Sequence, residues 1–378
     1  MLNSRASRIV AAGFLIRAFA GQALFWISWL ELPIARSLQL GNGLWFFALD
    51  GAGYMRYAAS LSARQTYPSH AFVEVLALFV AVFGNVASVA ILLNCAAYLA
   101  MCALVVRLPH SREARDAGVL FPLAALSFAP ALILWSLQPL KDTYFFLLMT
   151  AMVWLSKRWS EAPRVPIAAA MLIVMYELTG VRWYVGVIMW AAFAIFIITN
   201  RHRARTLLLF LLLATAVRLG GANDLPAIPR HGAATVVIDA RRGFEATPGA
   251  TTIAPATPSA AATAPPTPAA AVRIGFAAAF LPRFLGLVHI GGGRGLWVFA
   301  EIDTLAFDAV LVFAIVYSIR NRRRITPLFV FVLVVFVALA GPMIYTVTNF
   351  GTLFRLRGML YVLAALLPLA LAPRDAPQ

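Results

Sequence analysis

Long apolar runs separated by short charged segments make up most of this 378-residue chain. A helix that crosses a bilayer needs about 20 consecutive, mostly apolar residues. Segments that meet or approach this length predict about ten transmembrane helices, at 9–30, 73–106, 118–137, 143–156, 167–181, 183–199, 206–220, 303–319, 325–346 and 358–372. The pattern therefore predicts an all-α integral membrane protein.

The spacing of these runs divides the chain into three parts. Residues 1–220 form an N-terminal transmembrane module of about seven helices, with a first outer loop at 31–72, and residues 303–378 form a C-terminal module of about three. Between them, 221–302 is a long outer loop whose Pro/Ala/Thr-rich stretch, 247–271, is typical of a mobile linker. The apolar stretch 274–290 is interrupted by Pro282-Arg283, so we expect an interfacial helix there.

The first apolar run also has features of a signal peptide. Arg5 and Arg8 precede it, and Ala18-Phe19-Ala20 has the small-x-small form of a cleavage site. Apolar residues nevertheless continue to Leu30, which favours an uncleaved transmembrane helix over a cleaved leader.

Composition and charge support the membrane prediction. Hydrophobic residues make up 62% and charged residues 12% of the chain, whereas soluble domains carry about 25% charged residues. The net charge is 31 − 15 = +16, and in a soluble protein it would suggest a nucleic-acid partner. If the N-terminus is cytoplasmic, the predicted cytoplasmic stretches are 1–8, 107–117, 157–166, 200–205, 320–324 and 373–378. Together they contain 16 of the 31 cations and four of the 15 acids. The positive-inside rule explains this excess, so we expect no nucleic-acid partner and two cytoplasmic termini.

Charges on the outer side are more informative, because orientation does not require them. In the first outer loop, a turn signal at Gly41-Asn42-Gly43 precedes an amphipathic helix that carries Asp50 and Tyr54 on one face. Asp50 is a candidate general base, and the alternative is an N-cap role.

A very short outer hairpin carries Lys141 and Asp142. Lys141 would lie at the depth of a lipid phosphate, unless it only snorkels to the interface. Asp142 precedes an apolar helix and is expected to be its N-cap. Arg182 follows another helix, where it could bind substrate, anchor the helix at the interface or pair with Glu177.

Two arginines precede the last predicted span. If the segment 349–357 is extended, Arg355 and Arg357 point to the same side and could bind a phosphate together. The alternative is that both are simply solvated at the surface.

Other ionisable residues give weaker signals. Glu301 lies at the outer end of the eighth predicted helix, where it could cap the helix or form part of an acidic site. Arg17 and Asp308 lie inside predicted spans, where ionisable groups are costly and usually paired. The histidines lack ligand spacing, so we expect no metal site and no cofactor.

These residues resemble those of the multi-spanning GT-C type glycosyltransferases, and more loosely those of glycosyltransferases and polymerases of exopolysaccharide loci. The resemblance rests on Asp50 with Tyr54, Lys141-Asp142, Glu301 and the segment 349–357. It implies a bacterial inner-membrane enzyme of cell-envelope or polysaccharide biosynthesis that uses a polyprenyl-phosphate-linked sugar at the outer face. It also implies that Asp50 is the catalytic base, and that Lys141, Arg355 and, as a further candidate, Arg182 contact the lipid phosphate.

The sequence leaves other functions open. A polymerase or ligase that transfers an oligosaccharide from a pyrophosphate carrier fits the basic outer loops equally well. A transporter or flippase of a lipid-linked saccharide would carry paired charges near the bilayer centre and inverted repeats, and no internal repeat is evident. A non-catalytic subunit of an envelope complex is the third alternative.

Overall fold

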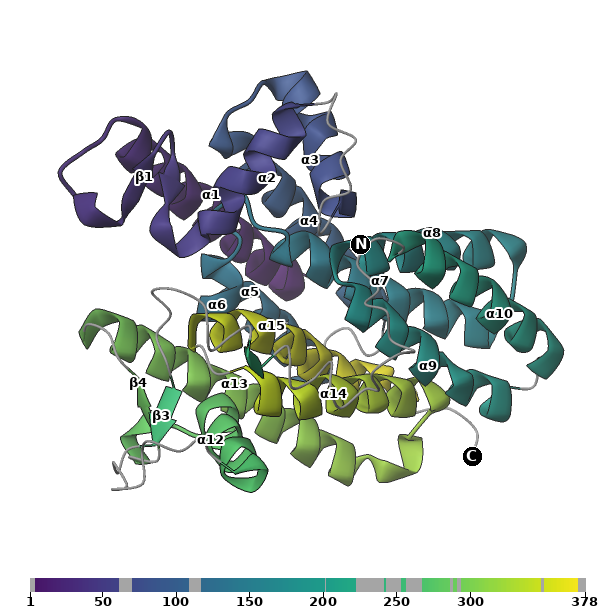
Figure 1. Cartoon of the computed structure of the whole chain (residues 1–378). Coiled ribbons are helices and arrows are strands. Elements are labelled where there is room, and N and C mark those ends of the chain that lie inside the picture. The colour runs from purple at the N-terminus through teal and green to yellow at the C-terminus, as the bar shows by residue number, and fades with distance from the viewer. Residues whose placement is uncertain are drawn as a thin grey trace.

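The computed structural model is almost entirely helical (Figure 1). It describes residues 4–60, 70–108, 117–200, 202–221, 241–242, 253–255, 267–285, 288–290, 294–347 and 350–372. In the first half the α-helices are α1 (Ser4–Trp29), α2 (Leu49–Ala59), α3 (His70–Phe83), α4 (Ala87–Arg107), α5 (Ala117–Phe128), α6 (Pro130–Leu134), α7 (Asp142–Glu161), α8 (Val165–Val181), α9 (Trp183–Thr199) and α10 (Arg203–Gly220). In the second half they are α12 (Pro268–Phe280), α13 (Arg294–Arg320), α14 (Pro327–Thr346) and α15 (Phe350–Leu366).

Within the described ranges, five helical segments are long and apolar enough to cross a membrane, namely Arg5–Trp29, Ala87–Arg107, Val298–Arg320, Pro327–Thr346 and Gly351–Ala370. Further apolar helices, such as α8 and α9, have only 17 residues each. The chain is therefore a helical membrane protein by the length and composition of its helices, and the number of ten spans stays a prediction.

Two predicted spans are each divided in the structure. The run 73–106 becomes α3 and α4, because Gly84 adopts a positive φ of 90° that ends the first helix. The run 118–137 becomes α5, the short α6 and a loop, because Pro130 cannot donate the hydrogen bond that would continue α5.

The last helix, α15, lies at the centre of the bundle. Its residues 359–366 are all buried, and the helix packs against α5, α7, α13 and α14. In Figure 1, α8–α10 lie on one side of α14 and α15, and α12 lies on the other side. The two predicted transmembrane modules thus pack directly against each other.

The segment between these modules has more regular structure than its composition suggests. Most of 247–271 falls outside the described residues, but Ile253–Pro255 (β3) pairs with Val288–Ile290 (β4), and α12 already begins at Pro268. The predicted break at Pro282-Arg283 is confirmed, because α12 ends at Phe280 and only a short 3-10 turn follows. Helix α12 packs against α14 so closely that Gly275 lies directly on the Ile344 carbonyl.

Two of the predicted cytoplasmic stretches, 107–117 and 157–166, are in contact, because Lys157 Nζ donates to the Leu108 carbonyl. Arg324 Nε of another such stretch donates to the Ala372 carbonyl at the end of the last predicted span, at 2.6 Å. The side of the membrane on which these segments lie stays a prediction.

Candidate functional site

The first loop is held against the bundle by its hairpin. Gln39–Gly41 (β1) pairs with Leu44–Trp45 (β2) around Asn42, which has a positive φ of 52°, so the predicted turn is confirmed. Trp45 Nε1 donates to the Leu24 carbonyl of α1 at 2.9 Å. The hairpin leads into α2, which places Asp50 in the first helical turn and buries Tyr54.

The loop before α7 is held in place by a side chain of α4. Asn94 Nδ2 donates to the carbonyls of Ser136 at 3.1 Å and Gln138 at 2.8 Å. Asn94 is fully buried, and an amide with two donors suits a loop whose carbonyls lack helical partners. This contact positions Lys141 and Asp142 beside α2.

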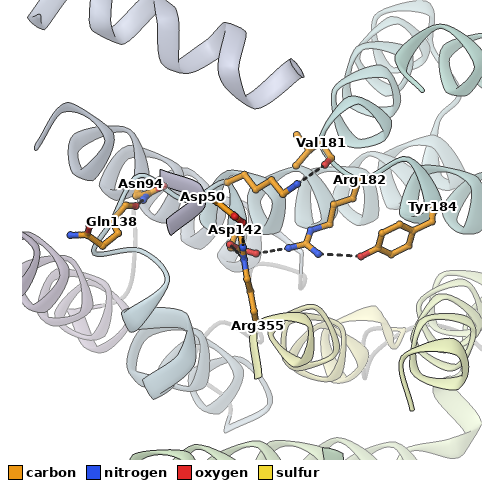
Figure 2. A network of polar contacts seen from close by, with 9 residues as sticks. Asp50, Asn94, Gln138, Asp142, Val181, Arg182, Tyr184 and Arg355 are labelled. Atoms are coloured by element: carbon orange, nitrogen blue, oxygen red, sulfur yellow. Dashed lines mark hydrogen bonds and ion pairs between the residues drawn. The ribbon is translucent and has the colours of Figure 1, made fainter. Parts of the chain in front are cut away.

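Four segments that are distant in the sequence meet at Asp142 (Figure 2). Its carboxylate accepts from Arg182 Nη2 through Oδ1 and from Arg355 Nε through Oδ2, each at 2.6 Å. Arg355 Nη1 also donates to Asp50 Oδ2 at 2.6 Å, and Arg182 Nη1 donates to the Tyr184 hydroxyl at 3.1 Å. We call Asp50, Lys141, Asp142, Arg182 and Arg355 the charged cluster.

Burial differs strongly between the two acids of this cluster. The Asp142 side chain is 0% exposed, whereas that of Asp50 is 54% exposed. Burial alone would raise the pKa of the Asp142 carboxyl, but the charges of Arg355 and Arg182 lower it below its usual value. Asp142 is thus a buried carboxylate whose charged form two arginines stabilise, and Asp50 is the carboxylate that solvent reaches.

Lys141 completes the cluster as its third cation. Its Nζ donates to the Val181 carbonyl at 3.3 Å and lies 6.0 Å from the centre of the Tyr54 ring. Burial, together with the charges of Arg182 and Arg355, lowers the pKa of Lys141 to about 7. Burial also raises the pKa of the Tyr54 hydroxyl to about 12. Tyr54 therefore stays neutral, and Lys141 gives up its proton easily.

The expected helix-capping roles of both acids are wrong. The N-cap of α2 is Ala48 and that of α7 is Lys141, and neither cap forms a side-chain hydrogen bond. Asp50 and Asp142 lie inside the first turns of their helices and bind arginines instead. The simple pairing of Arg182 with Glu177 is also wrong, because Glu177 Oε2 accepts from the Tyr144 hydroxyl at 2.9 Å while Arg182 binds Asp142.

Arg357 does not join Arg355, because the segment is helical rather than extended. Successive residues of a helix differ by about 100°, so two positions apart they point to nearly opposite sides. Arg357 forms an ion pair with Asp303 and donates to Thr304 Oγ1 at 2.8 Å, on α13. Glu301 is also on α13, where it accepts from the Phe284 amide at 3.5 Å. The partners of these contacts are not residues of the charged cluster.

Sequence reasoning missed the role of Asp303. Its Oδ1 accepts from the Ala131 amide at 2.8 Å, while Oδ2 binds Arg357. An acid at the outer end of a span was visible in the sequence, but its partners come from segments 172 and 54 residues away. Only the packing of α13 on α6 and α15 reveals the ion pair of Asp303 with Arg357, which is separate from the charged cluster.

Arg17 is buried inside α1 and has a structural role. Its guanidinium donates to the carbonyls of Ser127 at 2.7 Å and Leu126 at 3.0 Å. The Leu126 carbonyl would normally accept from residue 130, which is a proline without an N–H. Arg17 therefore satisfies the carbonyls that the break between α5 and α6 leaves free.

The charged cluster has the composition of an anion-binding site. Three basic side chains face two acids, and a bound anion would favour the protonated form of Lys141, which gives the cluster one positive charge more than its acids balance. Arg355 Nη2 and Arg182 Nε are buried and have no hydrogen-bond partner among the described residues. Buried donors without partners are costly, and a phosphate oxygen would satisfy them with charge-assisted bonds. The described residues contain no group of His, Cys, Asp and Glu that could hold a metal ion.

Comparison of the chain with protein-family models, with curated proteins and with solved structures gives no match.

Proposed function

We propose that the protein is a membrane glycosyltransferase that uses a polyprenyl-phosphate-linked sugar at the outer face of a bacterial inner membrane. The observation that carries this proposal is the charged cluster, in which a surplus of buried cations lies beside a half-exposed carboxylate. A phosphate group matches the surplus charge, and an acceptor hydroxyl matches the carboxylate.

The phosphate is the leaving group in this reaction. Lys141, Arg182 and Arg355 bind its oxygens and stabilise the negative charge that grows on them as the bond from the anomeric carbon to the phosphate oxygen breaks. The bonding electrons leave with the phosphate. Because Asp142 holds Arg182 and Arg355 before substrate arrives, little reorganisation of these two side chains is needed in the transition state.

The acceptor is activated by Asp50. Its carboxylate takes the proton of the acceptor hydroxyl while the acceptor oxygen forms the new bond to the anomeric carbon. Products are the glycosylated acceptor and the polyprenyl phosphate, and the proton remains on Asp50 until solvent removes it. The 54% exposed side chain of Asp50 gives that proton a path to water.

The membrane-embedded part suits a lipid-linked donor. The charged cluster is built from the ends of apolar helices, including the N-terminal part of α15, which is a candidate span. A phosphate held there leaves its isoprenoid chain next to apolar helix surfaces. A soluble sugar nucleotide would require no such placement.

The test uses the purified full-length protein in nanodiscs with a polyprenyl-phospho-sugar and a glycan acceptor. We expect turnover by the wild type, a loss of at least about 100-fold in kcat for Asp50→Asn, and a large rise in KM for Arg355→Ala. Arg36→Ala removes an exposed arginine of the same first loop and is the matched control. Full turnover by both site variants would refute the assignment, and products with several donor units would indicate a polymerase.

A further inference from the structure

One contact in the charged cluster blocks the site that the phosphate needs. Asp142 uses Arg355 Nε, so the two terminal nitrogens of that guanidinium remain for an anion. Nη1 already donates to Asp50 at 2.6 Å, and Nη2 is buried without a partner among the described residues. Each terminal nitrogen carries two hydrogens, but a phosphate bound to both nitrogens would lie next to the Asp50 carboxylate on Nη1, so the two anions repel each other and compete for Arg355.

The two carboxylates on Arg355 differ in how easily they can leave. Asp142 is fully buried and is also held by Arg182. Asp50 is 54% exposed and forms one ion pair within the part of the chain that the structure describes, and exposed ion pairs contribute little stability because water competes with them. An incoming anion will displace Asp50 and leave Asp142 in place.

The same contact also engages the oxygen with which Asp50 would act as a base. Asp50 Oδ2 accepts from the Arg355 guanidinium at 2.6 Å, which holds the carboxylate against α15. Displacement by phosphate would free this oxygen for an acceptor hydroxyl.

We infer that the Asp50–Arg355 ion pair is an autoinhibitory contact that the donor phosphate breaks. This inference rests on the proposed function and concerns the order of its steps. The donor binds first, its phosphate replaces Asp50 on Arg355, and the released carboxylate then activates the acceptor. Without donor, Asp50 stays paired and no acceptor is deprotonated.

Binding measurements separate this role from that of an ordinary binding residue. The probe is farnesyl phosphate, with farnesol as the uncharged analogue, titrated into the full-length protein in nanodiscs. Because Asp50 competes with the phosphate, Asp50→Asn is expected to bind farnesyl phosphate about two- to fivefold more tightly than the wild type, the range that an exposed ion pair allows. Farnesol affinity should not change.

The matched control is Glu31→Gln, which neutralises another exposed acid of the same loop, 3.8 Å from Arg36. It should leave the affinity for farnesyl phosphate unchanged, which excludes a general effect of the net charge. Inorganic phosphate added as a competitor shows whether the site binds a free anion equally well. Competition only at concentrations far above those of farnesyl phosphate supports a lipid phosphate as the ligand.

The outcomes also separate this inference from the proposed function. If the wild type binds farnesyl phosphate no better than farnesol, or if Arg355→Ala has no effect, both are wrong. If Arg355→Ala weakens binding but Asp50→Asn weakens it too or leaves it unchanged, only the autoinhibitory contact is refuted. Tighter binding by Asp50→Asn together with lost turnover is the expected result.

Discussion

Replacing Asp142 by asparagine tests whether the charged cluster depends on a buried anion. The change keeps the size of the side chain but removes its charge. Arg355 then retains Asp50 as a partner, whereas the Arg182 side chain retains, among the described residues, the Tyr184 hydroxyl and the Phe145 ring but no acid. Arg182 is 8% exposed, so it becomes a buried cation without a counter-charge.

The expected cost follows from that single uncompensated cation. Breaking a buried ion pair by removing one partner costs about 3–5 kcal/mol. Asp50→Asn makes the same chemical change at the other carboxylate of Arg355, but Asp50 is 54% exposed, and such pairs contribute about 0–1 kcal/mol. Both variants therefore replace an aspartate that binds Arg355 by asparagine, and they differ in how deeply the replaced side chain is buried.

Reversible unfolding in mixed detergent micelles measures both values. We expect Asp142→Asn to lower the free energy of unfolding by at least about 2 kcal/mol more than Asp50→Asn does. In the double variant Asp142→Asn/Arg182→Gln, part of the loss should be regained, because the uncompensated cation is gone. Equal costs for the two single variants would refute the argument from burial.

Three further predictions concern other parts of the molecule. Because burial lowers the pKa of Lys141 to about 7, against about 10.4 in the unfolded chain, the unfolded state binds more protons between these values. The free energy of unfolding should thus rise from pH 7 to 9, and Lys141→Met should abolish the rise. Arg17→Met leaves two carbonyls without donors and should destabilise the protein by about 2–4 kcal/mol, and unchanged thermal stability would contradict this role. Gly275→Ala would place its Cβ 1.8 Å from the Ile344 oxygen, so α12 should separate from α14 and become accessible to protease. Gly341→Ala, which meets no atom within 4 Å, is the control.

Hydropathy and charge alone predicted much of the architecture. Apolar runs of spanning length identified a helical membrane protein, because exposed backbone polar groups are too costly in lipid. The turn at Gly41–Gly43 and the break at Pro282 were predicted from local chemistry, since glycine adopts positive φ and proline lacks an N–H. Charge also identified Asp50, Lys141 and Asp142 as candidate site residues, because ionisable side chains are costly in an apolar environment and are usually functional or paired there.

Only the tertiary structure decided which charges are partners. Asp142 is bound by Arg182 and Arg355, which follow it by 40 and 213 residues, and no local pattern encodes which helices pack together. Arg355 and Arg357 were expected on one side, but the helical period of α15 sends them to different partners. The sequence by itself determined that charges gather at the helix ends, because charge is costly in lipid, and packing determined that five of them form one cluster.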